Sequence, residues 1–443
     1  MHRLLALALL AFIPTVVFAA PPTDLVDYVK HDDKAFAWKL AGKIATEAGT
    51  IYDIDLTSQR WQGITWTHKL QVFVPKGISP KATMPLWNQG GTPNVASNFL
   101  GVQLAQKIGA PVAFLYGIPN QPLFGGKRED ALIAETFVKY LETGDSTWPL
   151  LFPMVKSIVK AMDALQAFAK SEWQQDVKDF VVTGASKRGW TSWLAAATGD
   201  RRVKAIAPMV IDTLNFPAQM KNQVNAFGKP SLMVYNYVER KLIPIPDTAP
   251  AQKLWKMVDP WIYRDTITVP KMIINGANDP YWPLDALNSY WDDLKGEKYL
   301  LYVPNAGHDL REMDKDGAKQ LLPNRAVNTL SAFCKCQVFD KPMPKWSWKV
   351  DVKPTEIGWV AEFGSPWRKH RLHVAESATR DFRKSRWSDQ QFVESKDGAS
   401  NRTGMTLRQP ASGCTAGYME MEFDVDGLPL ALTTQLRILE AKK

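Results

Sequence analysis

The sequence predicts an α/β fold, in which a mostly parallel sheet carries helices on both faces and a small β-sandwich follows. Strand-like apolar segments alternate with helical stretches over residues 112–210, which is typical of parallel sheets. After Cys336 the pattern changes to short runs of alternating polarity, such as residues 346–350, separated by turn residues. We therefore expect an α/β domain over residues 20–340 and a β-sandwich-like domain over residues 341–443.

The first domain is expected to begin with antiparallel strands and to contain an insertion. Residues 35–75 alternate apolar and polar positions around Gly49, which predicts a β-meander leading into the sheet. Residues 212–265 are rich in Pro, Trp, Tyr and Asn and precede a predicted strand, so we expect a lid there. Further strands and helices are predicted over residues 112–116, 129–140, 151–169 and 205–210.

The most informative motif surrounds Ser186. A β-branched strand over residues 179–183 stops at Gly184, and an Ala- and Trp-rich helical pattern starts directly after the serine. Such a strand–turn–helix layout presents a serine hydroxyl at the sheet edge as a nucleophile. The usual motif has a glycine two residues after the serine, but Arg188 stands there and Gly189 follows. A simpler interpretation is a strand that ends in a capped helix.

A serine nucleophile needs a base, usually His, held by a carboxylate. Two candidates follow predicted strands: Asp279 after residues 270–275 and His308 after residues 298–303. With Ser186 they give the order nucleophile, acid, base, which is the order of α/β-hydrolases. Taken singly, Asp279 also fits a turn former before a proline, and His308 a loop histidine satisfied by a carbonyl. The acids kept in reserve are Asp285 and Asp309.

Acyl chemistry also needs N–H donors for the oxyanion. One is expected to be the backbone amide of Lys187, directly after the nucleophile. A second is expected from the Gly90-Gly91 pair, because this pair follows an apolar strand and precedes the elbow. A glycine pair by itself is more often an ordinary turn.

Several large side chains lie near the motif or in the insertion and are candidates for substrate binding. Aromatic residues in such places also serve as core, so this second interpretation stays open. The candidate substrate-binding residues are Arg188, Trp190, Trp255, Trp261 and Tyr281.

The chain begins with features of an exported protein. Residues 1–19 form a signal peptide, with a short basic start, an apolar run and a small residue at the cleavage site before Ala20. No later stretch is long and apolar enough to span a bilayer. Loss of Arg3 lowers the formal charge from +9 to +8, which suits an anionic envelope surface, whereas nucleic acid is not an expected partner. We expect a periplasmic or secreted protein.

Three cysteines remain after export. Cys334 or Cys336 joined to Cys414 would staple the two domains, but free thiols fit equally well. His370 and His373 lie in a strand-like segment, where their spacing points the rings to opposite faces. No metal and no cofactor are therefore expected.

Six motifs follow one another along the chain: residues 118–123 (IPNQPL), 129–134 (EDALIA), 184–191 (GASKRGWT), 258–260 (VDP), 278–280 (NDP) and 303–308 (VPNAGH). Together they resemble the PhoPQ-activated pathogenicity-related protein family from about residue 24 to residue 340. This resemblance implies an α/β-hydrolase-like fold in a secreted or envelope protein, linked in bacteria to envelope stress and host antimicrobial peptides. It implies no particular substrate, and it makes Arg188 part of the family's own elbow. The spacing at Lys187 also resembles glucuronoyl esterases, which implies an ammonium offered to the oxyanion or to a substrate carboxylate.

We therefore expect an exported serine hydrolase that transfers an acyl group to water, an esterase acting on an envelope or glycan ester. The alternatives are a peptidase of the same fold and a binding or signalling protein that keeps the scaffold without catalysis. A third is an adhesin acting through the C-terminal domain, where five residues are expected to be exposed: Trp367, Arg368, Lys369, Arg383 and Arg386. A solvated basic face explains these residues more simply.

Overall fold

The computed structural model describes residues 20–394 and 402–442. The predicted signal peptide, residues 1–19, lies outside the described residues. Within the described part of the chain, no helix combines the length and apolarity that crossing a bilayer requires.

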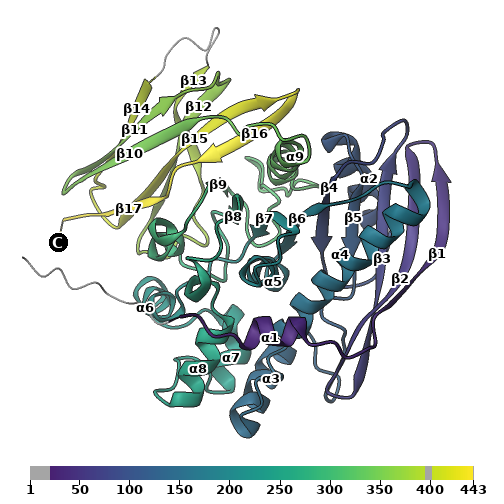
Figure 1. The fold of residues 1–443 in the computed structure, drawn as a ribbon. Coiled ribbons are helices and arrows are strands. Elements are labelled where there is room, and N and C mark those ends of the chain that lie inside the picture. The colour runs from purple at the N-terminus through teal and green to yellow at the C-terminus, as the bar shows by residue number, and fades with distance from the viewer. Residues whose placement is uncertain (1–19, 395–401, 443) are drawn as a thin grey trace, which may run out of the picture.

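A nine-stranded sheet in the order β1-β2-β3-β5-β4-β6-β7-β8-β9 forms the frame of the first domain (Figure 1). From β5 onward every neighbour is parallel, whereas β1, β2, β3 and β5 pair antiparallel. Both the meander and the mostly parallel sheet are confirmed. The strands are β1 (Ala37–Thr46), β2 (Gly49–Trp61), β3 (Ile64–Pro75), β4 (Thr83–Asn88), β5 (Val112–Leu115), β6 (Asp179–Ala185), β7 (Val203–Met209), β8 (Lys271–Gly276) and β9 (Lys298–Val303).

Helices cover both faces of this sheet, because its central strands are apolar on both sides. On β6, Phe180 and Val182 belong to one core cluster with α4 and α5, whereas Val181 belongs to another with α2 and α9. The helices and short 3₁₀ segments are α1 (Asp24–Lys30), α2 (Val95–Ile108), α3 (Glu129–Thr143), α4 (Leu151–Trp173), α5 (Lys187–Ala197), α6 (Phe216–Phe227), η1 (Leu232–Val234), α7 (Tyr235–Glu239), α8 (Ala249–Val258), η2 (Pro260–Tyr263), η3 (Ala286–Ser289), η4 (Trp291–Asp293) and α9 (Asn324–Val338).

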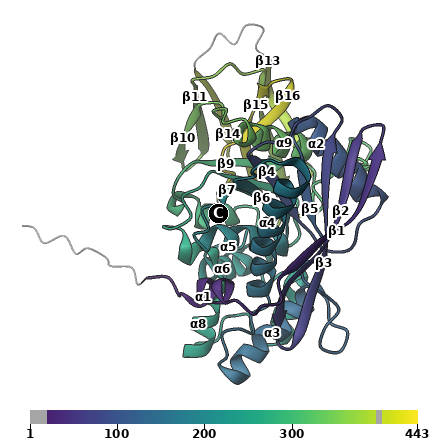
Figure 2. The same ribbon diagram turned by 45° about the vertical axis from the view of Figure 1, so that its right-hand side comes forward.

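Two antiparallel sheets follow, as predicted. One has the order β10-β11-β14, and the other has the order β13-β12-β15-β16 with β17 beside β15. Their facing side chains, such as Trp359 and Met419, share a core cluster with α9. Figures 1 and 2 show this sandwich lying against α9 and the β9 edge of the large sheet. Its strands are β10 (Trp346–Lys353), β11 (Glu356–Phe363), β12 (Lys369–Ser377), β13 (Ser388–Glu394), β14 (Arg402–Arg408), β15 (Cys414–Val425), β16 (Leu428–Thr433) and β17 (Arg437–Glu440).

The structure shows where the cysteines and Trp367 lie. Cys334, Cys336 and Cys414 are all buried free thiols, so no disulfide staples the domains. Trp367, expected to be exposed, is instead buried, because its ring packs against Phe363 and its neighbours in the sandwich core. The described residues contain no group of three or more His, Cys, Asp or Glu side chains placed to hold a metal ion.

Candidate functional site

Ser186 stands on a strained turn between β6 and α5. Its backbone has φ 59° and ψ −129°, a region that L-residues rarely adopt. The turn is fixed by backbone hydrogen bonds on both sides, from Ser186 N to Met209 O at 2.8 Å and from Trp190 N to Ser186 O at 2.9 Å. The Ser186 side chain makes no capping hydrogen bond to α5. The geometry is therefore that of a nucleophile elbow and differs from an ordinary capped helix.

Two glycines allow strand and helix to approach closely at this elbow. A Cβ on Gly184 would lie 2.6 Å from Asn88 Nδ2, and a Cβ on Gly189 would lie 2.7 Å from Ile211 Cγ2 and 2.9 Å from Met209 O. Position 189 is thus a place in this elbow where only glycine fits. This explains how position 188, where the usual motif has glycine, can hold an arginine.

The Arg188 side chain is buried beside the elbow. Its guanidinium forms a bidentate pair with Glu129, at 2.6 and 2.7 Å, and Nε donates to Ile118 O at 2.5 Å. Gly90 makes room for it, because a Cβ there would lie 2.3 Å from Arg188 Nη2. Arg188 does not line the cavity at Ser186. The expectation of a substrate-binding Arg188 is therefore replaced by a structural role at the elbow.

Lys187 adds a second cation to the same cluster. Its Nζ lies 2.9 Å from Glu129 Oε2 and 3.2 Å from Asp130 Oδ2. Burial raises the pKa of Glu129, but the hydrogen bonds and charge of Arg188 and the charge of Lys187 outweigh this and lower the pKa to about 2. Two cations thus face two carboxylates beside Ser186, and the four charges balance.

Asp279 and His308 meet at the carboxyl ends of β8 and β9. His308 Nδ1 donates to Asp279 Oδ2 at 2.7 Å, and the backbone N–H of Tyr281 donates to Asp279 Oδ1 at 2.9 Å. An ionised carboxylate only accepts hydrogen bonds, so the proton stands on Nδ1 and the lone pair on Nε2. The Tyr281 ring stacks on the imidazole with centroids 4.1 Å apart.

The other imidazole nitrogen, His308 Nε2, is buried and has no hydrogen-bond partner among the described residues. No hydrogen bond joins it to Ser186 Oγ, although both residues are described. Apo structures often show such catalytic contacts as longer than they are with substrate.

The loops that carry this pair are tied to each other by backbone contacts. Ala277 N donates to Val303 O and Asn278 N donates to Ala306 O, both at 2.9 Å. Gly276 permits this approach, because a Cβ there would lie 2.3 Å from Gly307 O. The six residue pairs that keep β8 and β9 in register bring these loops to the same sheet edge.

A small cavity, partly open to solvent, is lined by Ser186 and by side chains of the helical insertion over residues 212–265. Of the expected substrate-binding residues, Trp190, Trp255 and Tyr281 line it. Trp261 does not, because its Nε1 donates to Asp293 Oδ2 at 2.7 Å and its ring lies under Arg264. The remaining lining residues are Asp130, Lys187, Ile211, Thr213, Phe216, Met220, Val234, Tyr237, Ile243 and Trp282.

The expected oxyanion residues lie at neighbouring strand ends. Lys187 is the first residue of α5, where helix N–H groups have no intrahelical acceptor. Gly90 and Gly91 follow β4, which lies next to β6 in the sheet. The backbone amide of the preceding residue, Gln89, is not available as an oxyanion donor, because it donates to Leu115 O at 2.8 Å. Gly91, with φ 68°, also borders a separate polar groove that includes Arg128.

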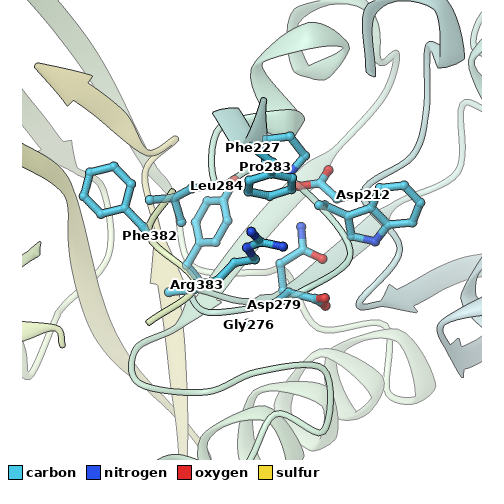
Figure 3. A pocket seen from close by; sticks show the side chains of 12 residues that line it. Asp212, Phe227, Gly276, Asp279, Pro283, Leu284, Phe382 and Arg383 are labelled. Carbon is cyan, nitrogen blue, oxygen red and sulfur yellow. The ribbon is translucent and has the colours of Figure 1, made fainter. Parts of the chain in front are cut away.

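Asp279 also lines a second small cavity, which is partly open to solvent as well (Figure 3). Asp212, at the end of β7, lines it together with Asp279 and accepts a hydrogen bond from Tyr290 Oη at 2.5 Å. Burial, and less strongly the charge of Asp279, raises the pKa of Asp212 to about 7. Phe382 and Arg383 of the sandwich domain form the opposite wall.

Three contributors to the site were not found from the sequence. Asn88 fastens the elbow by donating to Thr183 O and Ser192 Oγ and by accepting from Thr191 Oγ1. Glu129 and Asp130 hold the two cations. The sequence analysis included the motif at residues 129–134, but no local feature indicates which side chains Glu129 and Asp130 contact.

A model of the PhoPQ-activated pathogenicity-related protein family matches residues 25–383. Autocrine proliferation repressor protein A of Dictyostelium discoideum is 31% identical over 459 aligned residues, which cover 96% of this chain and 90% of that protein.

Solved structures similar to this chain include two hydrolases. Acetyl xylan esterase 1 of a Thermoanaerobacterium species has a TM-score of 0.46 and 16% identity, covering 67% of this chain and 92% of the esterase. An S-formylglutathione hydrolase of Agrobacterium tumefaciens has a TM-score of 0.45 and 14% identity, covering 68% of this chain and 99% of the hydrolase.

Proposed function

The chain belongs to the PhoPQ-activated pathogenicity-related protein family, and from this premise we propose that it is an exported serine hydrolase with Ser186, His308 and Asp279 as its triad. The single observation that supports this most is the 2.7 Å hydrogen bond between Asp279 and His308, formed at the same sheet edge as a serine on a strained elbow.

In the first half of the reaction, Ser186 Oγ attacks the acyl carbon and His308 Nε2 takes the hydroxyl proton. Asp279 keeps the other proton on Nδ1 and stabilises the imidazolium that forms. The oxyanion receives hydrogen bonds from the backbone N–H of Lys187 and from the Gly90–Gly91 loop. His308 then returns the proton to the leaving alcohol as the C–O bond breaks, which leaves an acylated serine.

In the second half, water attacks the acyl-serine with His308 as base. The proton returns to Ser186 Oγ, and a carboxylic acid leaves. Both halves use the same donors, so no further group is required.

We propose an ester of an envelope or glycan component as the substrate. The cavity at Ser186 has mainly apolar and aromatic walls, which suit an acyl group. A peptidase that reads a peptide N-terminus needs an uncompensated carboxylate, but Glu129 and Asp130 are paired with Lys187 and Arg188. The balanced cluster therefore favours an ester over a peptide.

One observation favours a second candidate, a signalling protein on a hydrolase scaffold. The curated relative from Dictyostelium is named as an autocrine repressor of proliferation, which describes a signal and not a reaction. The missing Ser186–His308 hydrogen bond is also compatible with a scaffold that performs no catalysis.

Labelling with a fluorophosphonate probe separates the two candidates. The wild-type chain and the matched control Ser171→Ala, a serine at the exposed end of α4, are expected to be labelled equally. Ser186→Ala is expected to lose labelling and turnover while its melting temperature stays nearly unchanged. Equal labelling of wild type and Ser186→Ala, or none of either, would contradict the hydrolase proposal. A panel of acyl esters, glucuronate methyl esters and peptide anilides then distinguishes esterase from peptidase.

A further inference from the structure

The sandwich domain reaches the catalytic end of the large sheet through residues 378–387, the loop between β12 and β13. Figure 3 shows Arg383 of this loop beside Asp279, with Phe382 lining the same pocket farther away. We propose that this loop is a positioning element, which sets the relative place of the catalytic acid and base. The inference rests on the proposed triad, and it gives the C-terminal domain a role in catalysis.

On the acid side the loop holds Asn278, the residue before Asp279. Asn278 Nδ2 donates to Phe382 O at 3.1 Å and to Ser385 O at 2.7 Å. The side chain of Asn278 is buried, so these two bonds are shielded from water. The backbone next to the carboxylate is thereby fixed from the outside by another domain.

On the base side the loop holds Asn305, three residues before His308. The two groups exchange hydrogen bonds: Trp387 N donates to Asn305 Oδ1 at 2.8 Å, and Asn305 Nδ2 donates to Trp387 O at 2.9 Å. Asn305 has φ 54°, in the left-handed region that few residues other than glycine, asparagine and aspartate adopt. The reciprocal pair with Trp387 stabilises this turn, from which His308 projects.

The loop is held by apolar packing and by its own turn. Phe382 and Trp387 are buried, and the Trp387 ring lies 5.1 Å from that of Tyr418 on β15. Ser385 N donates to Phe382 O at 3.0 Å, which closes the turn between them. The side chains of Phe382 and Trp387 therefore pack in the apolar cluster of the large sheet, while their backbone groups are bonded to the acid and base loops.

The same loop also contacts the helical insertion. The Arg383 guanidinium carbon lies 3.9 Å from the centroid of the Phe227 ring, at the end of α6. Three parts of the site, namely the acid loop, the base loop and the insertion, thus meet one segment of the second domain.

Domain attachment by itself does not require these contacts. Asn288 of η3 makes a separate set of bonds with the sandwich, donating to Leu436 O at 3.0 Å and accepting from Gln435 and Arg437. Asn288 lies in the same β8–β9 connection as Asp279, but its side-chain hydrogen bonds go to residues 435–437 and not to the loop over residues 378–387. It is therefore a matched control for the loss of an asparagine at the domain junction.

The experiment compares Asn305→Ala and the isosteric Asn305→Asp with Asn288→Ala in the full chain. One readout is the rate of fluorophosphonate labelling between pH 5 and 9, whose midpoint reports His308. The other is the low-field proton resonance of the His308–Asp279 hydrogen bond, assigned by its loss in Asp279→Asn. Both Asn305 variants are expected to slow labelling roughly 10- to 100-fold, to move the pH midpoint and to shift the resonance. Asn288→Ala is expected to lower the melting temperature and leave all three unchanged.

Wild-type labelling and an unshifted resonance in folded Asn305 variants would overturn the positioning role. Asn305→Asp keeps the size and the acceptor of the native residue, so it provides the test if Asn305→Ala does not fold. If the wild type itself is not labelled, the proposed function fails, and the resonance still decides whether the loop positions the pair.

Discussion

Replacing Gly90 by alanine tests the account of the elbow more directly than any change to the triad. The new Cβ would lie 2.3 Å from Arg188 Nη2 and 2.9 Å from Cζ, closer than atoms in contact allow. The guanidinium cannot easily move away, because Glu129 and Ile118 O hold it on the other side. The clash must therefore break part of the Arg188–Glu129 pair.

The expected loss can be worked from these contacts. Each hydrogen bond to a charged group contributes about 1.5–3 kcal/mol, and two join Arg188 to Glu129. The Glu129 side chain is 39% exposed, which reduces their value through solvent screening. We therefore expect Gly90→Ala to lower the free energy of unfolding by about 3 kcal/mol. Gly91→Ala is the control: nothing lies within 4 Å of its Cβ, and its φ of 68° costs about 1–2 kcal/mol.

A double-mutant cycle with Arg188→Ala isolates the clash. Without the arginine, Gly90→Ala has nothing to displace, so its cost is expected to fall to about zero. Urea unfolding followed by tryptophan fluorescence measures all four proteins, and the coupling between the two positions should be about 3 kcal/mol. Additive effects of the two substitutions would refute the proposed path of the Arg188 side chain past Gly90.

Three further predictions concern the site. Gly189→Ala drives a Cβ to within 2.7 Å of Ile211 Cγ2, so the variant should lose fluorophosphonate labelling, and a labelled variant of normal rate would contradict the elbow geometry. Burial raises the pKa of Asp212 to about 7 in the folded protein, so its contribution to stability is present at low pH and is lost as pH rises through 7. The melting temperature of Asp212→Asn, relative to that of the wild type, should therefore rise between pH 5 and pH 8. A difference that stays constant over this range would contradict the raised pKa. Trp255→Ala removes a wall of the cavity at Ser186, so KM for short acyl esters should rise more than kcat falls, and an unchanged KM would place the acyl group elsewhere.

The parts of the site that depend on local pattern were predictable. Ser186, Asp279 and His308 each follow a strand that is a short, continuous apolar run, because the sheet is buried on both faces. Parallel strands end at one sheet edge, so the order of these residues along the chain predicted that they gather there, and the structure joins two of them, Asp279 and His308, by a hydrogen bond. The meander was equally readable, since its strands alternate polarity with a period of two.

Pairings between distant segments were not predictable. Nothing next to Arg188 shows that its partner is Glu129, and in the sequence an arginine after a nucleophile looks like a ligand for substrate. Trp367 was expected to be exposed, yet it is buried with its ring against Phe363. The bonds between Asn305 and Trp387 join two domains, so neither segment shows them alone. Long-range contacts of this kind depend on how the domains dock.

The neutral cluster at the elbow also limits what Lys187 can do. The resemblance to glucuronoyl esterases implies that its ammonium binds a substrate carboxylate, but Nζ already lies 2.9 Å from Glu129 and 3.2 Å from Asp130. A substrate carboxylate would replace one anion by another and gain little net energy, because the displaced carboxylate would lose its own partner. The amino terminus of a peptide would have to displace Lys187 or Arg188 from the carboxylates of Glu129 and Asp130, which again gains little net energy. Charge at this position therefore selects neither acidic nor basic substrates strongly. Under the proposed function, we therefore expect substrate selection to depend on how the acyl group fits the aromatic walls of the cavity at Ser186.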